Sequence, residues 1–504
     1  MIAKVLSVAL TGIEGALVEV ETDMKQGLPG IQIVGMGNKA VNEARERIRS
    51  AIRHSLLEVP ARKFTINLAP AALPKDGSHF DLALAVSLLV ATSQLRQTEV
   101  DDALFAGELS LDGTLKPVRG AVTIAEATKA AEVHSLFIPA AQAPQAALID
   151  GVSVYGVSTL KEVFLHLKGI APLLPAKKPQ VPYIPLLDFS FDDIIGQETA
   201  KRALQIAIAG HHNLLIIGPP GAGKTLLAQA AQSLLPPLSL EEQIAITKIQ
   251  GLSSQPTSVI TAHRPFRNPH HSTSMSALIG GGSKLYPGEI TRAHLGILYL
   301  DELPEFSPNV LEALRQPLES RDVQLSRLNT HHTYPADFIL IATMNPCPCG
   351  YYGDAQQTCR CSASKRQRYR RRLSGPLLDR IDIIIHVSRL EIELLQRTNM
   401  LHKGQHSKVL ESVVKSISVQ HARYNSSHKC NGYLTPREIS VFLNVEKTAE
   451  KLLQTAAKKL HLTARSYFKI LKVAQTITDL EAARTITNAH VSEALQLRVS
   501  LSEM

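Results

Sequence analysis

The octapeptide GPPGAGKT at residues 218–225 constrains the fold of this chain more than any other feature. It follows the apolar run LLII at 214–217 and precedes the helix-prone stretch 226–235. A strand, a glycine-rich loop and a helix in this order form a phosphate-binding loop, in which backbone N–H groups and the helix N-terminus surround a polyphosphate. The sequence therefore predicts that ATP is bound by eight consecutive residues: Gly218, Pro219, Pro220, Gly221, Ala222, Gly223, Lys224 and Thr225.

A second strand-like run, GILYLDE at 296–302, ends in two acids. Doubly wound sheets hold their ligands at the carboxyl ends of parallel strands. Asp301 is suited to Mg²⁺ through water, and the hydroxyl of Thr225 can hold the same ion. Glu302 is suited to polarising an attacking water, because phosphoryl transfer needs positioning and charge neutralisation. We therefore expect ATP hydrolysis with Mg²⁺. Two solvated acids at a strand end are the alternative.

Three more polar residues follow in order. A third buried-looking strand in DFILIATMN ends at Asn345, whose amide could orient the water or touch the terminal phosphate. Arg380 lies in PLLDRID on a short exposed turn, and Arg465 lies in LTARSYFKIL at the start of an amphipathic helix. Both arginines are expected to lack a local carboxylate partner. Such arginines are usually surface charges, which is the alternative to a role in catalysis.

The order of loop, acid pair, asparagine and two arginines is similar to that of AAA+ ATPases. The chain resembles the magnesium-chelatase-like AAA+ family, and specifically its ComM/YifB branch. The resemblance covers nearly the whole length and includes DFSFDDIIGQ, FRNPHHSTSMSALIGGG, LYLDELPEF, the paired CPC and CRC, and RLSGPLLDRID. It implies a ring of subunits, expected to be a hexamer. Arg380 would then reach a neighbouring subunit's nucleotide, whereas Arg465 would contact the nucleotide within its own subunit.

Composition favours a polyanionic partner. The net charge is +9 and the isoelectric point is about 9.2, which is an electrostatic footprint for nucleic acid. Aromatic residues make up 5% of the chain and Trp is absent. Contacts of Lys and Arg with backbone phosphates are therefore more plausible than base stacking. The start MIAKVLSVALTGIEG has only a brief apolar run, so we expect a cytoplasmic protein with no membrane partner.

Two segments could grip single-stranded or branched DNA. The insert RPFRNPHHSTSMSALIGGGSKLYPGEI contains Arg267 and Lys284 among turn-forming residues, and RDVQLSRLNTHHTYPADF alternates like a hairpin and contains Arg327. By resemblance these are the helix-2 insert and the pre-sensor hairpin of ring helicases. A cross-strand ion pair is the alternative for Arg327. The basic run KRQRYRRR at 365–372 is either a solvated helical face or a contact with nucleic acid or a neighbouring subunit.

The predicted fold is a multidomain α/β protein. Residues 1–168 form an α+β domain that resembles Lon-type proteases at PKDG and AGELSLDGTLKPVRG, but His79 stands at the nucleophilic Ser position and Val122 near the Lys position. Without a serine and an amine base, peptidase activity is not expected. A Pro-rich linker follows at 169–185, because proline lacks the N–H that a helix needs. We expect a parallel-sheet AAA+ core at 186–390 and a helical lid at 391–504.

Four of the five cysteines lie in CPCGYYGDAQQTCRC: Cys347, Cys349, Cys359 and Cys361. Thiols stay reduced in the cytosol, so the cluster favours a metal over disulfides. Four thiolates would satisfy tetrahedral Zn²⁺, although the C-x-C spacing is tighter than in common structural sites. Unligated thiols are the second interpretation, and an iron–sulfur cluster is the third.

Three functions are compatible with these features. The first is an ATP-driven DNA motor, which the family resemblance associates with branch migration in homologous recombination and with integration of transforming DNA. The second is a chaperone-like ATPase that remodels a protein complex, as the magnesium-chelatase subunit does. The third, an ATP-dependent protease, is disfavoured by His79 and Val122.

Overall fold

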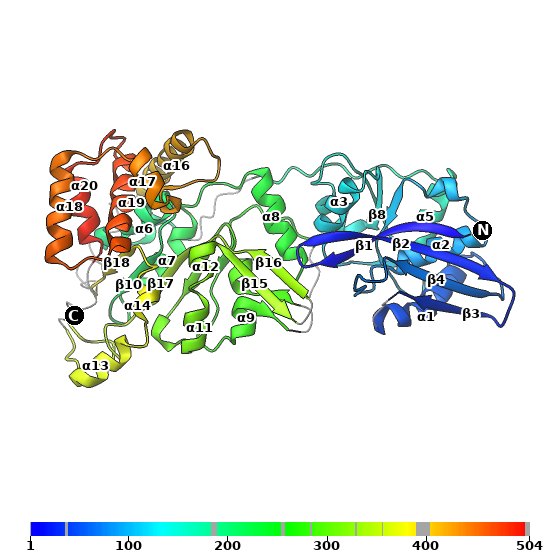
Figure 1. Ribbon diagram of the computed structural model, residues 1–504, viewed down its shortest axis with the longest axis horizontal. Helices are drawn as coiled ribbons and strands as arrows, with labels where there is room; N and C mark the ends of the chain where they lie inside the picture. Colours follow the sequence, from blue (N-terminus) through cyan, green and yellow to red (C-terminus); the bar gives the residue numbers. More distant parts are fainter. Residues whose placement is uncertain are drawn as a thin grey trace.

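The computed structural model describes residues 2–35, 39–182, 189–253, 258–282, 285–327, 330–354, 356–389 and 404–498. The molecule is elongated, with the N-terminal sheet at one end, the ATPase sheet in the middle and a group of helices at the other end (Figure 1). The mixed α/β class, the parallel sheet of the core and the C-terminal helical region are confirmed.

The N-terminal part is built on a seven-stranded mixed sheet in the order β3-β4-β2-β1-β5-β8-β9. Its long strands pair antiparallel, and β1, β5, β8 and β9 pair parallel to one another. The core lies under α2, whose residues from Asp81 to Val90 are all buried, as expected for a helix with apolar residues on every face. The strands are β1 Ala3–Thr11, β2 Glu14–Lys25, β3 Gly30–Val34, β4 Lys63–Ala69, β5 Ala103–Phe105, β8 Ser135–Pro139 and β9 Ser153–Val157. The helices are α1 Lys39–His54, α2 Asp81–Ala91, α3 Ala121–Ala130, α4 Ala143–Ala146 and α5 Leu160–Leu167, and β6 Glu108–Leu109 pairs with β7 Leu115–Lys116.

The Pro-rich stretch contains no helix or strand from residue 170 to residue 182. Two contacts join this stretch to the N-terminal part. The Ala176 N–H donates to the carbonyl of Val154 in β9 at 2.7 Å, and Lys178 pairs with Asp150 at 2.7 Å. The chain therefore leaves the N-terminal sheet along its β9 edge.

The ATPase core is a five-stranded parallel sheet in the order β11-β14-β17-β10-β18. Its central strands are buried at every position because helices cover both faces, which explains the continuous apolar runs in the sequence. The strands are β10 Leu214–Ile217, β11 Phe266–Arg267, β14 Ile297–Leu300, β17 Ile339–Met344 and β18 Ile383–His386. Helices of this part include α6 Glu198–Gly210, α7 Lys224–Gln232, α8 Leu240–Gly251, α9 Met275–Ile279, α10 Glu289–Arg292, α11 Pro308–Ala313, α12 Pro317–Ser320, α13 Ala363–Arg370 and α14 Gly375–Leu378.

Two small antiparallel pairs extend from this core. The predicted hairpin is confirmed as β15 Asp322–Arg327 and β16 Thr330–Pro335, with Arg327 opposite Thr330. The insert contains β12 Gly280–Gly281 paired with β13 Tyr286–Pro287.

The C-terminal helices pack on α6 and share one hydrophobic core with the ATPase sheet. They are α16 Gln405–Tyr424, α17 Pro436–Phe442, α18 Lys447–Lys459, α19 Ala464–Leu480 and α20 Asn488–Gln496. A buried carboxylate joins them: Asp479 of α19 accepts hydrogen bonds from Arg423 of α16 at 2.9 Å and from Asn431 at 2.9 Å. This network fixes the orientation of α19, which carries Arg465 in its first turn.

The N-terminal part docks on α8 and on the insert of the core. The Gly120 N–H donates to the carbonyl of Gly251 at 2.9 Å, Lys248 of α8 pairs with Glu126 of α3, and Arg119 donates to the Tyr286 hydroxyl at 2.8 Å. Figure 1 shows α8 and the β15–β16 hairpin between the two sheets.

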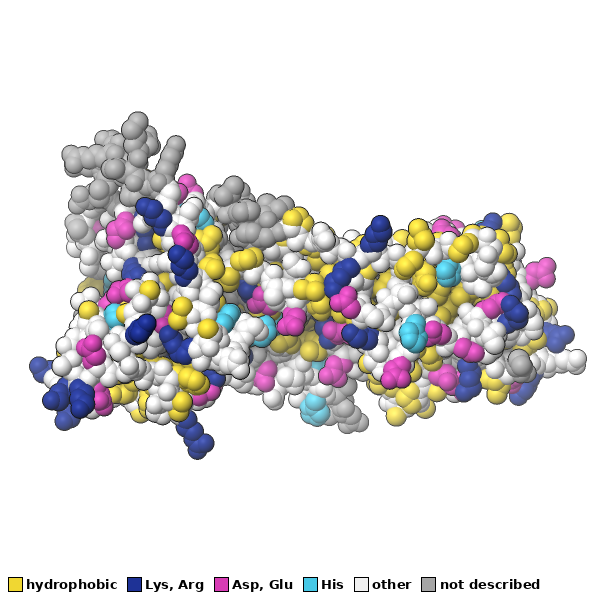
Figure 2. Space-filling view, turned by 90° about the horizontal axis from the view of Figure 1, so that it is seen from above, with side chains coloured by type: hydrophobic (Ala, Val, Ile, Leu, Met, Phe, Trp, Pro, Cys, Tyr) yellow, Lys and Arg dark blue, Asp and Glu magenta, His cyan; other side chains and the backbone are white. Residues whose placement is uncertain are grey.

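No helix within the described ranges is long and apolar enough to cross a membrane. On the face seen in Figure 2, Lys and Arg side chains are interspersed with Asp and Glu over most of the length of the molecule. The excess positive charge is therefore not gathered in one large patch on that face.

Candidate nucleotide site, arginine pair and cysteine cluster

The phosphate-binding loop leaves the carboxyl end of β10, which lies between β17 and β18 in the sheet. The Gly218 N–H is bound to the carbonyl of Met344 at 3.1 Å, so the loop starts beside the end of β17. Gly221 and Gly223 both have φ of +79°, and nothing would lie within 4 Å of a side chain at either position. Because only glycine adopts this backbone freely, the loop forms an open concave surface lined by backbone. That geometry fits a polyphosphate at the N-terminus of α7.

Lys224 and Asn345 meet at the centre of this surface. The Lys224 ammonium donates to Asn345 Oδ1 at 3.1 Å and to the carbonyls of Gly218 and Pro219 at 2.7 and 2.9 Å. Burial lowers the pKa of Lys224, and the carboxylates of Asp301 and Glu302 partly oppose that shift. The amine is therefore held between the loop and the end of β17, where it can exchange its carbonyl acceptors for phosphate oxygens.

The acid pair lies beside them at the end of β14. The Thr343 hydroxyl donates to Asp301 Oδ1, and the Glu302 N–H donates to the Thr343 hydroxyl oxygen at 3.2 Å. Glu302 has a left-handed backbone with φ of 52°, which is strained for a residue with a side chain and is common at functional turns. The Tyr299 hydroxyl donates to Thr225 Oγ1 at 3.4 Å. The predicted Mg²⁺ ligands thus share one edge of the sheet.

Three residues near the nucleotide site were not predicted from the sequence pattern: Tyr299, Thr343 and Gln197. Tyr299 and Thr343 are single polar residues inside buried apolar strands. A lone polar residue in such a strand is the sequence feature that could have identified them, because buried polar groups need hydrogen-bond partners. Gln197 donates to the carbonyls of Ser388 at 2.7 Å and Ala222 at 3.5 Å, which ties the phosphate loop to the end of β18. Its left-handed conformation could not be read from the sequence.

Arg380 is not isolated, contrary to expectation. Its guanidinium donates to the carbonyls of Arg315 at 2.9 Å and Pro376 at 2.7 Å, and it pairs with Glu319 of α12. Arg465 donates to the same carboxylate at 2.7 Å. Long-range packing brings Glu319 to both arginines, so inspection of their sequence neighbours could not reveal this partner.

Both arginines line a cavity of about 540 Å³ at the amino-terminal edge of the sheet. The cavity is also lined by the residues that immediately precede β10, β17 and β18, which are Asn213, Phe338 and Asp382. The phosphate loop leaves the other end of β10, a strand that is roughly 13 Å long at about 3.3 Å per residue. In this structure Arg465 therefore lies at the opposite edge of the sheet from the phosphate loop of its own subunit.

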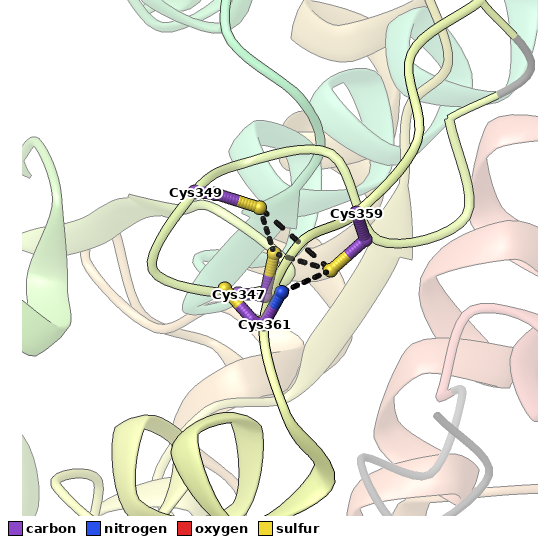
Figure 3. Close-up of side chains that lie close together, drawn as sticks. All are labelled: Cys347, Cys349, Cys359 and Cys361. Carbon is purple, nitrogen blue, oxygen red and sulfur yellow. Dashed lines mark hydrogen bonds between the residues drawn. The ribbon is translucent and has the colours of Figure 1, made fainter.

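The four cysteines of the paired C-x-C motifs come together (Figure 3). Their sulfur atoms all lie within 4.8 Å of one another, and Cys347 Sγ is 3.3 Å from Cys349 Sγ and 3.6 Å from Cys359 Sγ. Burial and the neighbouring thiol raise the pKa of Cys347 to about 12. Burial opposes ionisation of Cys349, yet the N–H groups of Tyr351 and Arg360 outweigh it and lower its pKa to about 6. The donor set and its spacing fit one tetrahedral ion that prefers thiolates.

The candidate DNA contacts are spread over separate elements. Arg267 in β11 pairs with Glu289 at 2.6 Å, so its charge is largely neutralised within the chain. Arg327 ends β15 at the tip of the hairpin, although its side chain lies outside the described residues. Lys284 also lies outside the described residues.

The two positions that would carry protease chemistry hold inert side chains. His79 is buried, its Nε2 is 2.7 Å from the carbonyl oxygen of Val8, and burial lowers its pKa to about 4. Val122 is buried in α3. Neither side chain can supply a hydroxyl nucleophile or an amine base.

Comparison with known proteins supports one family over the whole chain. The family described as magnesium chelatase, subunit ChlI, matches residues 190–395. A second family model, described as subunit ChlI of Mg-chelatase, matches residues 20–142. A third, described as the C-terminal part of magnesium chelatase subunit ChlI, matches residues 404–498.

Two relatives are similar over nearly their full length, and a third is similar over about one third of its length. Competence protein ComM of Haemophilus influenzae is 41% identical over 503 residues, which cover 99% of this chain and 97% of that protein. YifB of Escherichia coli is 40% identical over 492 residues, covering 97% and 96%. Lon protease 2 of Bacillus subtilis is 29% identical over 184 residues, covering 32% and 33%. This chain therefore belongs to the ComM/YifB family of magnesium-chelatase-like AAA+ proteins.

Proposed function

We propose that this protein is an ATP-driven, ring-forming DNA motor that unwinds or branch-migrates DNA during homologous recombination and integration of transforming DNA. The observation that supports it most is the separation of the phosphate loop from the Arg380–Arg465 pair, which occupy opposite edges of one sheet. Arginines that cannot reach their own nucleotide can reach that of a second copy. A closed ring, which we propose is a hexamer, supplies that copy to every subunit.

Each nucleotide-site residue has a role in this proposal. The backbone of residues 218–223 and the ammonium of Lys224 hold the phosphates of ATP. Thr225 and Asp301 hold Mg²⁺, which supplies charge neutralisation when bound. Glu302 orients and polarises the attacking water, and Asn345 positions it against the terminal phosphate. Arg380 and Arg465, held side by side by Glu319, neutralise developing charge from the neighbouring subunit.

DNA is proposed as the substrate on three grounds. The chain has a net charge of +9, and the hairpin ends at Arg327. The third ground is the name of a relative that is similar over nearly its full length, Competence protein ComM. We propose that Arg327, with Arg267 and Lys284 of the insert, contacts backbone phosphates in the ring. Arg267 is the weakest of the three because Glu289 already pairs with it.

The test compares ATP turnover without DNA, with single-stranded DNA and with a branched junction, and measures strand displacement of the same junction. The proposal expects turnover to rise with DNA and the junction to be resolved only with ATP. A chaperone-like ATPase that remodels a protein complex is the alternative, which the chelatase family models favour. ATP turnover that no DNA stimulates, together with an intact junction, would reject the motor and leave this alternative.

We also propose that the four cysteines hold Zn²⁺. Four sulfur donors within 4.8 Å of one another suit a soft tetrahedral ion. Purified protein should then carry about one zinc per chain by elemental analysis. Protein that is stable and active without metal would reject this site.

A further inference from the structure

The cysteine cluster begins two residues after Asn345, the amide that contacts Lys224 at 3.1 Å. Cys347 is buried, and Pro346 lies between it and Asn345. Because proline fixes its own φ and restricts the residue before it, little slack separates the first cysteine from the amide. The position of Cys347 Sγ is therefore coupled to the direction of the Asn345 side chain.

The cluster also rests directly on the phosphate loop. Gly350 has φ of +86°, and a side chain there would come within 2.6 Å of Pro220 Cδ. The backbone of the cysteine segment thus lies against the ring of Pro220. Arg389 fastens the same contact, since it donates to the Pro220 carbonyl at 3.3 Å and pairs with buried Asp354 at 3.2 Å.

The far end of the segment leads into α13. Cys361 is followed by Ser362, whose hydroxyl caps α13 by accepting from the Lys365 N–H at 3.3 Å. The four sulfurs join the two C-x-C motifs, so the segment from Cys347 to Cys361 forms a loop whose two ends meet at the cluster.

We propose that metal binding by the four cysteines braces the nucleotide site: the ion closes this loop and thereby holds Asn345 and Pro220 in the positions that bind ATP. This inference rests on the proposed zinc site and on nucleotide binding by the phosphate loop, but not on DNA as the substrate. Without the ion, only weak thiol contacts join the two C-x-C motifs, and the segment no longer supports Pro220 or Asn345. Nucleotide affinity then falls although every phosphate-contacting residue is present.

The experiment measures two quantities on the full-length protein: the zinc-to-chain ratio, and the equilibrium affinity for a non-hydrolysable ATP analogue with Mg²⁺. Cys359→Ser and Cys361→Ser should lose zinc and weaken analogue binding by about tenfold, which corresponds to a loss of about 1.4 kcal/mol of binding free energy. Cys430→Ser is the matched control, because Cys430 is a buried free cysteine outside the cluster. It should retain both zinc and affinity.

Two further measurements separate the brace from simple misfolding. Chelation of zinc from the wild-type protein should weaken analogue binding, and added Zn²⁺ should restore it. Gly350→Ala pushes against Pro220 without touching a sulfur, so it should keep zinc but weaken the analogue. Lys224→Ala should no longer bind the analogue but should keep zinc. That result would show that zinc binding does not require bound nucleotide.

The outcomes are distinct. Metal-free wild-type protein with unchanged analogue affinity would overturn the brace while leaving the nucleotide site intact. Wild-type protein that neither contains zinc nor binds added Zn²⁺ would overturn the metal site itself. Failure of DNA stimulation would reject the DNA motor and leave the brace unaffected.

Discussion

Replacing Arg380 by Ala should abolish ATP turnover without preventing ATP binding. An arginine that acts from a neighbouring subunit typically contributes about 10³- to 10⁵-fold to turnover, equivalent to roughly 4 to 7 kcal/mol. The expected loss of folding free energy is much smaller. Arg380 loses two carbonyl acceptors and an ion pair with Glu319, whose side chain is 52% exposed, so the loss of folding free energy should be about 1 to 2 kcal/mol.

The decisive assay mixes two inactive proteins. Arg380→Ala keeps Glu302 and Glu302→Gln keeps Arg380, so an interface between the two variants pairs an intact acid with an intact arginine in one of the two orders. In rings that assemble randomly from equal amounts, about a quarter of the interfaces are competent. We expect turnover to recover toward that fraction in the mixture, and each variant alone to stay inactive.

Arg372→Ala is the control for loss of a surface arginine. Arg372 pairs with Glu305 at 2.7 Å and both side chains are about half-exposed, so turnover should stay near that of the wild type. Rings shown to contain both variants but lacking any recovery would refute action between subunits.

The remaining predictions concern the other parts of the molecule. Lys224→Ala should weaken ATP binding, whereas Glu302→Gln should bind ATP and stall hydrolysis; equal ATP affinity of wild type and Lys224→Ala in a direct binding assay would contradict the first. Arg327→Ala should leave basal turnover nearly intact but abolish branched-DNA unwinding and flatten the salt dependence of DNA binding; unwinding at the wild-type rate would remove Arg327 from the substrate contacts. Arg423→Leu should destabilise the C-terminal helices by about 3 to 5 kcal/mol in denaturant unfolding, because it leaves the fully buried carboxylate of Asp479 without its cation; a loss below about 1 kcal/mol would refute a stabilising role for this ion pair.

The sequence predicted elements with strong local patterns. The helix after the phosphate loop, α7 at Lys224–Gln232, and the hairpin of β15 and β16 agree with prediction because periodicity and turn residues are local properties. The assembly of Lys224, Asp301 and Asn345 was also predictable, since the carboxyl ends of parallel strands meet at one edge.

The edge on which Arg465 lies could not be predicted in the same way. It depends on how the C-terminal helices pack against α6, and that packing rests on contacts such as Arg202 with Glu493 at 2.8 Å, which join residues far apart in the chain. The resemblance to AAA+ ATPases supplied the order of the motifs but not the placement of α19. Glu319 was overlooked for the same reason, because its two partners approach from distant segments.

The N-terminal part contacts the ATPase core through its second Lon-like segment. Arg119 stands at the end of the second Lon-like segment, and its guanidinium lies near the ring of His79 and also donates to the Tyr286 hydroxyl at 2.8 Å. The region that would hold a peptidase nucleophile is thus joined to the insert of the ATPase core. On the other side, the Gly120 N–H binds the last residue of α8. Any movement of the insert during ATP turnover must therefore carry the N-terminal part with it or break these contacts, whereas the phosphate loop at the far edge makes none of them.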